Sequence, residues 1–562
     1  IRFARSFNIE IQLHLYLESL EVEPAISVLE EAESDSLDEL GIFHVFSKPS
    51  EALKTALAEL SAHPVVKNPK IRFGNFPFCF FPADRFKLTY RDVVEPVKGL
   101  IGSQRDLIKE VRGRKPAGHT SCVSCRSRNA CCAFTEIEDH PEYGPFLEPR
   151  TESSLVFSGG SLAGTKAPAD DSEVWVEPAE QGDMVAAVMD GFETLLIIDG
   201  YFYTRFPCTT FEVMLALEQG INVFGSSSMG ALRAVELDRF GMIGVGFVFD
   251  YLKARPIKPY HVVAQTYDDL DRPISTPLIE ILFFLRSAVE EGLLFEDEFE
   301  AARDAADRIH FTEVSFERFF DQVPFGEETV ANLKRFWDEI DTDIKKRDAL
   351  ELLETYKAKR DTDRVREIFR SVRNQSLKVL FEKYSGDPDL SLPDDWNEAG
   401  DGAEVGRDLR AVPPEETRGR AERFFEDLTI TVADTSKYDD SGQFILSVFF
   451  VPFYFMDYYP SSATGNGDDF EEALTSAWME LVERAPACGL HIRQEPRDEW
   501  AGPFFPVNRL PQVENWGMQE AVKQHAAETH GYARVTDMVS GERFVVPRFV
   551  TMFAYSGTDG LA

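Results

Sequence analysis

The strictest constraint on the fold is the alternation of apolar runs and amphipathic segments between residues 151 and about 260. We expect short buried strands at 155–157, 194–199 and 221–224. Between and after them, apolar residues recur at helical spacing over 211–219 and 231–240. Strands that alternate with helices in this way favour a parallel sheet with helical crossovers.

The rest of the chain divides around this α/β layer. With 562 residues the chain is too long for one hydrophobic core. Residues 1–150 contain a cysteine cluster, and the α/β layer runs into a helical subdomain, so that this region spans 151–383. Residues 384–420 are poor in large apolar side chains and are predicted to be an acidic linker. A new α+β pattern occupies 421–562.

Composition and charge exclude some classes of partner. The net charge of -38 repels nucleic-acid phosphates and anionic membranes, so we expect neither as a partner. The most apolar run, 444–459, is short and contains Pro452 and Asp457, which favours buried strands over a membrane span. Without an export signal, the seven cysteines indicate a reducing, cytoplasmic location. A homodimer is compatible with the sequence.

A serine-rich turn follows the strand at 221–224. Ser226–Gly230 has the small-x-Ser-x-Gly pattern of a nucleophile elbow, with Ser228 at its tip. The backbone N–H groups of Met229 and Gly230 would begin a helix and could bind an anion. Asp199 ends the preceding strand and is expected at the same carboxyl edge of the sheet. The alternative is an ordinary strand-to-helix turn with a serine cap.

A carboxylate-bearing helix is predicted after the glycine-containing stretch 464–470, which we expect to form a tight loop. Ser476, Glu480 and Glu483 fall on one helical face, with Arg484 beside them. Two carboxylates one turn apart could hold Mg²⁺ against the phosphates of ATP. The alternative is a solvated helix face with an ordinary ion pair.

Cysteines cluster in the first 150 residues. Cys79 precedes the pattern Cys122-x2-Cys125-x5-Cys131, which supplies four soft ligands for a [4Fe-4S] cluster or a tetrahedral Zn²⁺. The alternative is a set of thiols that bind no metal.

Two long blocks resemble TfuA-like proteins. They are FGSSSMGALRAVEL from Phe224 and FGMIGVG from Phe240, and shorter matches include 156–162, 181–183 and 198–202. The resemblance implies a flavodoxin/Rossmann-like parallel α/β domain that assists sulfur supply for thioamide formation. Ser228, Asp199 and Arg233 are the catalytic candidates that it suggests.

The TfuA resemblance also contains a departure from the family's pattern. TfuA-like relatives carry a His-x-Glu step after the Asp-Gly-Tyr strand, and this chain has Thr210 and Glu212 there. A serine nucleophile without that histidine lacks the expected base. A non-catalytic docking or sulfide-guiding role therefore stays open.

Residues 421–562 resemble the first part of a YcaO domain. Ser476, Glu480, Glu483 and Arg484 match the first ATP/Mg²⁺ motif of that family, although Asn466 stands where a lysine is usual. The resemblance implies ATP-dependent activation of a peptide amide. It also implies that the second Glu-rich motif lies beyond this chain, as expected of a fragment. The cysteine layout resembles the auxiliary-cluster region of radical SAM proteins, although the Cys-x3-Cys-x2-Cys motif of their core is missing.

Together these resemblances imply an enzyme that converts a peptide backbone amide to a thioamide with ATP and Mg²⁺. Its partners would be a precursor peptide and a sulfur donor, either sulfide or a thiocarboxylate carrier protein. One alternative is an azoline-forming cyclodehydratase. Another is a non-catalytic scaffold that recruits the peptide and a separate YcaO enzyme.

Overall fold

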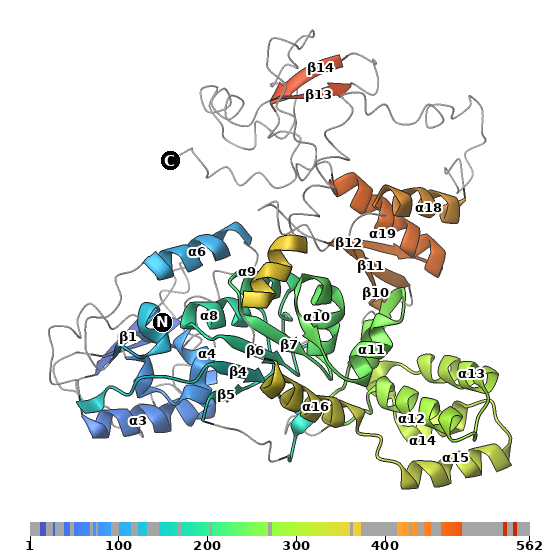
Figure 1. Ribbon diagram of the computed structural model, residues 1–562, viewed down its shortest axis with the longest axis horizontal. Coiled ribbons are helices and arrows are strands. Elements are labelled where there is room, and N and C mark those ends of the chain that lie inside the picture. Colours follow the sequence, from blue (N-terminus) through green and yellow to red (C-terminus); the bar gives the residue numbers. More distant parts are fainter. Residues whose placement is uncertain are drawn as a thin grey trace, which may run out of the picture. The chain divides into compact units, whose positions relative to one another are not determined.

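The computed structural model forms two compact units, which we describe separately (Figure 1). One unit contains residues 1–255 and 260–370, and the other contains 256–259 and 371–562. The structure describes residues 12–17, 26–27, 39–44, 50–67, 71–74, 77–90, 101–113, 122–131, 145–165, 171–202, 205–267, 273–359, 363–372, 413–425, 430–436, 443–450, 462–485, 532–536 and 543–547.

A five-stranded, wholly parallel sheet lies at the centre of the first unit, in the order β5-β4-β6-β7-β8. Its strands are β4 (Ser154–Phe157), β5 (Glu173–Val176), β6 (Thr194–Ile197), β7 (Asn222–Gly225) and β8 (Ile243–Gly244). The strand order in chain terms is 2-1-3-4-5, so the direction of winding reverses between β4 and β6. The predicted parallel α/β layer is confirmed.

Helices cover both faces of this sheet, which explains why its strands are apolar throughout. Three crossover helices cover one face: α8 (Asp183–Asp190), α9 (Thr210–Glu218) and α10 (Met229–Leu237). Helix α16 (Ile344–Ala358) lies on the opposite face (Figure 1). It packs Leu352 and Tyr356 against Val156, Leu196 and Phe224. These three strand residues lie in one row of the register, because Leu196 pairs with both of the others.

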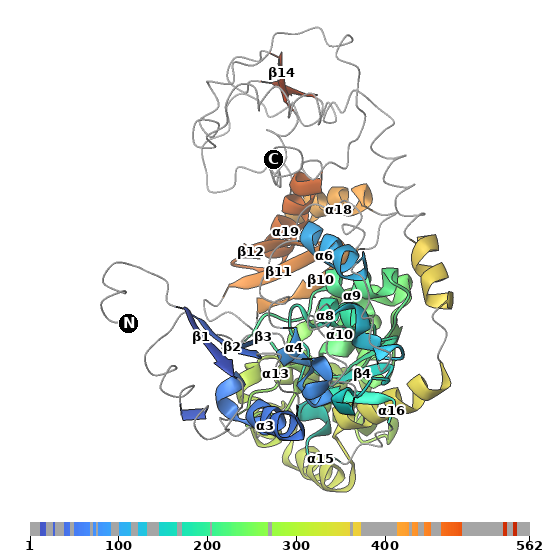
Figure 2. The same cartoon turned by 90° about the vertical axis from the view of Figure 1, so that its left-hand side faces the viewer.

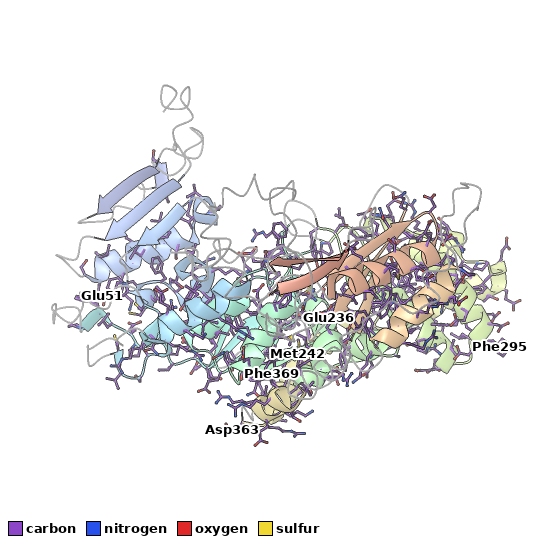
Figure 3. The ribbon with its side chains drawn as sticks, turned by 90° about the horizontal axis from the view of Figure 1, so that it is seen from above. Glu51, Glu236, Met242, Phe295, Asp363 and Phe369 are labelled. Atoms are coloured by element: carbon purple, nitrogen blue, oxygen red, sulfur yellow. The ribbon has the colours of Figure 1, made fainter. Side chains whose placement is uncertain are left out.

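Further helices continue this unit. Helix α11 (Phe247–Lys253) follows β8. The helices that come after it lie in the predicted helical subdomain, and they are α12 (Leu278–Glu290), α13 (Glu296–Asp307), α14 (Phe316–Gln322) and α15 (Glu327–Glu339). Buried Phe284 packs its ring within 6.1 Å of Phe316, Phe320 and Phe336, centroid to centroid. Phe295, at the start of α13, is 75% exposed and lies at the outer end of these helices (Figure 3).

The first 150 residues belong to the same unit as the sheet. They include β1 (Gln12–Leu17), β2 (Glu39–His44), β3 (Ile71–Gly74), α3 (Glu51–Ala62), α4 (Phe86–Thr89) and α6 (Ile101–Gly113). Strands β1, β2 and β3 form a parallel sheet. Buried Asp190, which ends α8, accepts from Arg126 and from Ser127 in the cysteine-containing segment. The cysteine region is therefore packed on the α/β layer through buried charge pairs.

The second unit contains a mixed four-stranded sheet, in the order β12-β11-β10-β9. Its elements are β9 (Ile257–Pro259), β10 (Ile430–Asp434), β11 (Phe444–Phe450), β12 (Ser462–Gly467), α18 (Pro414–Phe424) and α19 (Phe470–Ala485), with a separate hairpin of β13 (Tyr532–Thr536) and β14 (Arg543–Pro547). Helix α19 packs on β11 and β12, and α18 packs on α19 (Figure 2). The predicted apolar face of α19 is confirmed, because Ala473, Ala477 and Leu481 are buried in this core.

One local prediction for this unit is wrong. Residues 464–467 are not a loop, because they form most of β12, and Gly465 lets α19 approach that strand closely. A Cβ at Gly465 would lie 2.1 Å from the backbone oxygen of Ala473. Of the predicted linker, residues 384–412 lie outside the described part of the chain, and its last residues begin α18, which is held to α19 by the Arg418–Glu471 ion pair.

Within the parts of the chain that the structure describes, no helix has the length and apolar character needed to cross a bilayer.

Candidate functional site

The carboxyl ends of β4 and β6 flank the point where the winding of the sheet reverses. Open α/β sheets place their ligands in the crevice at such a point. Asp199, two residues after β6, is 5% exposed and binds the loop that follows β4. Its Oδ2 accepts from the N–H groups of Gly159 (2.9 Å) and Ser161 (3.0 Å), and its Oδ1 accepts from the Ser161 hydroxyl (2.6 Å).

This arrangement defines what Asp199 does in the fold. The N–H groups of the β4 loop could have bound an external anion, but here they are satisfied by a carboxylate of the same chain. Asp199 therefore acts as a positioning residue that joins the ends of β4 and β6. The predicted location of Asp199 at the carboxyl edge is confirmed.

The serine turn after β7 lies at the same edge, because the Ser228 N–H donates to the carbonyl oxygen of Ile198 at 3.3 Å. Backbone strain in this turn lies at Ser227, whose φ of 67° falls in the left-handed region. The Ser227 hydroxyl is buried within 2.8 Å of both the Ser161 hydroxyl and the Lys345 carbonyl oxygen. The strained residue of the elbow is thus one position earlier than the predicted tip, Ser228.

Glycines make the close approach of α10 to the sheet possible. A Cβ at Gly230 would lie 1.6 Å from the carbonyl oxygen of Ile197, and one at Gly225 would lie 2.1 Å from the carbonyl oxygen of Gly230. The Phe224–Gly230 motif therefore brings the first turn of α10 directly against β6 and β7.

The three serines of the turn differ in their surroundings. Ser228 is 4% exposed, and no side chain in the described parts of the chain forms a hydrogen bond with its hydroxyl. Ser226 is fully buried and its hydroxyl has no partner within the same ranges. Ser227 is held by its two polar neighbours. Of the three hydroxyls, that of Ser228 is the one with both some exposure and no competing bond.

Arg233, the third predicted catalytic residue, lies inside α10 and forms an ion pair with Glu236. Glu236 also accepts from the Tyr260 hydroxyl, and it lies among the central elements of its unit (Figure 3). Burial raises the pKa of Cys208 to about 12, although the charge of nearby Arg233 acts in the opposite direction. The structure thus brings Asp199 and Ser228 to one edge and gives Arg233 a separate set of buried partners.

A buried acidic pair lies at the start of α8 and α9. Glu212 accepts from the N–H of Gly182 at 2.6 Å and caps its own helix through Thr209, and burial raises its pKa to about 7. Burial also raises the pKa of Asp183 to about 6, although Lys87, 2.9 Å away, acts in the opposite direction. The side chains of Glu212 and Asp183 thus hold the starts of α8 and α9 at the carboxyl edge of the sheet.

Sequence reasoning missed Lys87 and the three residues beside it, Tyr201, Arg205 and Phe206, which we call the aromatic rim. The ammonium of Lys87 lies 5.6 Å from the ring centroid of Tyr201, and the guanidinium of Arg205 lies 4.4 Å from it. Phe206 next to them is 69% exposed. The only sequence signal for this rim was the position of Tyr201 directly after the Asp-Gly step.

The predicted ATP and Mg²⁺ residues lie on α19. Glu480 Oε2 accepts from the N–H of Thr464 at 3.0 Å, which ties the helix to β12, while Ser476 is exposed. Glu483 and Arg484 fall within the helix, but their side chains lie outside the described part of the chain. The role of these four residues stays a prediction.

The predicted metal ligands come from two segments that the fold brings together. Phe78, next to Cys79, donates its N–H to the sulfur of Cys131 at 3.4 Å. Burial raises the pKa of Cys79 and raises the pKa of Cys122 to about 11. The nearby thiol of Cys125 raises both pKa values further. Within the described ranges, no three His, Cys, Asp or Glu side chains are placed so that they could hold a metal ion.

Comparison with known families matches residues 199–315 to the family described as TfuA-like protein. The chain therefore carries a TfuA-like domain, as the serine-turn blocks predicted, and the matched residues include Asp199, Ser228 and Arg233. No match supports the YcaO or radical SAM resemblances. No curated protein matches the chain.

Proposed function

We propose that this chain takes part in thioamidation of a peptide backbone, and that its TfuA-like domain delivers sulfur to a YcaO active site. The observation that carries the proposal is the family match over 199–315, because TfuA proteins in general work with YcaO proteins on peptide substrates. The strand order 2-1-3-4-5 fits the flavodoxin-like class expected of this domain.

The carboxyl edge of the five-stranded sheet is the proposed site of sulfur release. There the Ser228 oxygen would attack the acyl carbon of a carrier-protein thiocarboxylate. The carbon–sulfur bond breaks, and the hydroxyl proton leaves with the sulfur as hydrosulfide. Water then hydrolyses the resulting serine ester and restores the hydroxyl. This sequence is balanced without an oxidant or a reductant.

The first turn of α10 leaves one N–H group that could support this step. The N–H groups of Gly230 and Ala231 donate to the carbonyl oxygens of Ile198 and Ser226. The Met229 N–H has no such acceptor in the described ranges, and it would be the donor to the acyl oxygen, because Met229 directly follows Ser228. Asp199 would position the loop beside Ser228 and would take no part in bond making. A second candidate role is docking or sulfide guidance without catalysis. It is favoured by the lack of a described base next to Ser228.

For the second unit we propose that α19 contributes to ATP and Mg²⁺ binding through Ser476, Glu480, Glu483 and Arg484. Support comes from the spacing of these residues on one helix and from the exposure of Ser476. If the site belongs wholly to another protein, this chain would instead act as the scaffold that recruits it. Azoline formation is the remaining alternative, and it leaves the TfuA-like domain unexplained.

The test is mass spectrometry of a precursor peptide incubated with this chain, a YcaO partner, ATP, Mg²⁺ and a sulfur source. Replacement of one oxygen by sulfur supports thioamidation, and loss of one water indicates azoline formation. A comparison of two sulfur sources, a thiocarboxylated carrier protein and free sulfide, distinguishes catalytic sulfur release by the TfuA-like domain from a docking role. Ser228→Ala should abolish product from a thiocarboxylated carrier and spare product from free sulfide.

The matched control is Ser226→Ala, which removes a neighbouring hydroxyl that has no described partner. If Ser228→Ala retains full activity with the carrier, the catalytic role is refuted and the docking role is favoured. Loss of product in Glu480→Ala/Glu483→Ala with either sulfur source would support the nucleotide role of α19. Unchanged product in that variant would support the scaffold.

A further inference from the structure

Arg150, which lies shortly before β4, carries a buried positive charge without a counter-charge. Its side chain is 4% exposed, and its Nη2 donates to the carbonyl oxygens of Phe78 (2.6 Å) and Phe81 (3.2 Å). Its Nε and Nη1 are buried and find no hydrogen-bond acceptor within the described ranges. No carboxylate in those ranges forms an ion pair with it. Burial of an unpaired charge is costly, so this guanidinium needs an anion beside it.

Two carboxylates in this region are already paired with another arginine. Asp190 lies 2.5 Å from Arg126, and Glu152 lies 3.4 Å from it. Arg126 also has one unused donor, its Nε, but its guanidinium stacks 3.8 Å from the centroid of the Phe192 ring. A ring face at that distance accounts for a donor that has no oxygen acceptor.

Arg150 has no comparable substitute. Its guanidinium lies 6.0 Å from the centroid of the Phe78 ring, at the outer limit of a cation–π contact. Burial raises the pKa of Cys79 and raises that of Tyr90 well above its ordinary value, so both groups stay neutral near pH 7. The Tyr90 hydroxyl has no hydrogen-bond partner among the described residues, although the charge of nearby Asp190 raises its pKa further. Tyr90 and Arg150 both lie beside Phe78, so their unused donors are close together.

We propose that Arg150 binds a small monovalent anion, of which chloride is the simplest, and that the ion also accepts from the Tyr90 hydroxyl. One unpaired positive charge requires one negative charge. The unused donor atoms have no exposed surface, which favours a small ion over the carboxylate of a larger ligand.

The ion would stabilise two segments of the chain that meet at Arg150. The Arg150 side chain binds the segment that contains Phe78, through the two carbonyl oxygens. Its backbone binds the cysteine-containing segment, because its N–H donates to the sulfur of Cys125 (3.4 Å) and its carbonyl oxygen accepts from the N–H of Arg126 (2.9 Å). Loss of the anion should therefore loosen residues 77–90 and 122–131 more than distant helices.

The proposal goes beyond the role proposed for the TfuA-like domain, and its test needs no activity assay. The full-length chain is melted in potassium salts of constant ionic strength, in which chloride replaces gluconate, an anion too large for the site. The melting temperature should rise by about 2 °C for each tenfold increase in chloride above its dissociation constant. General screening by salt stays constant in this series.

Variants assign the effect to one side chain. Arg150→Met should lose the chloride dependence, and Arg150→Lys should keep part of it. The readout is this dependence and not the melting temperature itself, because Arg150→Met also loses the bonds to Phe78 and Phe81. Arg335→Gln is the matched control, because it removes an exposed arginine and should leave the chloride dependence intact.

A second measurement on the unchanged sequence decides the question if Arg150→Met does not fold. Hydrogen exchange by mass spectrometry is compared in chloride and in gluconate. Peptides that cover 77–90 and 122–131 should exchange several-fold more slowly in chloride, and a peptide from α12 should not change.

Three results would overturn the proposal. One is an equal melting temperature of the unchanged protein in chloride and in gluconate. Another is a chloride dependence in Arg150→Met as large as that of the unchanged protein, which would mean that halide binds elsewhere. The third is slower exchange in α12 to the same extent as in the two segments.

Discussion

Removal of the Asp199 carboxylate should loosen the carboxyl edge of the five-stranded sheet. In Asp199→Ala the N–H groups of Gly159 and Ser161 lose their acceptor while they stay largely buried. An unsatisfied buried donor costs about 1 to 3 kcal/mol, so two of them should cost about 3 kcal/mol once some water enters.

Asp199→Asn is a matched control because both backbone N–H groups donate to the same oxygen, Oδ2. An asparagine whose amide oxygen occupies that position keeps both bonds. Its amide nitrogen then replaces Oδ1, and the Ser161 hydroxyl must accept where it had donated. We expect Asp199→Asn to cost only about 1 kcal/mol.

Hydrogen exchange measured by mass spectrometry localises this effect better than global unfolding, because the chain contains two units. Peptides that cover 154–165 should exchange about a hundredfold faster in Asp199→Ala, since each 1.4 kcal/mol is about tenfold. A peptide from α12 serves as the internal reference. Equal protection in Asp199→Ala and the unchanged protein would refute the reasoning, as would equal exchange in the two variants.

Three further outcomes follow from the packing and from the buried acids. Gly230→Ala should destabilise the first unit by about 3 kcal/mol or more, seen as a lower melting temperature, because its Cβ would overlap a carbonyl oxygen of β6. The unfolding free energy should fall by about 2 kcal/mol as the pH rises from about 5 to 7.5, because the native state retains the proton of Glu212 up to its raised pKa of about 7, whereas the unfolded chain loses it near 4.5. Denaturant titrations of Glu212→Gln at several pH values should show a smaller fall. Gly465→Ala should lower the denaturant concentration at which the core around α19 unfolds, because its Cβ would overlap the backbone of α19. Gly419→Ala in α18 is the control: its Cβ has room, so it should raise the unfolding free energy by up to about 1 kcal/mol. Equal effects of the two variants would contradict this account of β12.

Most of what could be predicted from the sequence came from the spacing of its apolar residues. The strands and helices around the serine turn were predictable because apolar runs and helical spacing are local signals. The same holds for α19, whose apolar face is regular. Such signals do not depend on what packs against the element.

The predictions that failed depended on distant contacts. The glycines of β12 suggested a loop, because glycine is common in loops, but Gly465 is required by the helix that packs over the strand. The pair between Lys87 and Asp183 joins two regions that sequence patterns treat separately. Neither residue type nor spacing shows that Asp199 binds the β4 loop, because the carboxylate meets its partners only after the sheet has formed.

The short strand β9 limits how this protein can be dissected. It pairs with β10 in the second unit, although the chain on either side of it, up to Arg255 and from Tyr260, belongs to the first. A fragment that begins at residue 371 would lack this strand, and the exposed edge of β10 would invite aggregation. A recombinant form of the second unit should therefore carry Ile257–Pro259, attached through a designed linker. No single proteolytic cut can release the second unit whole, because Pro256–Pro259 lies between two segments of the first.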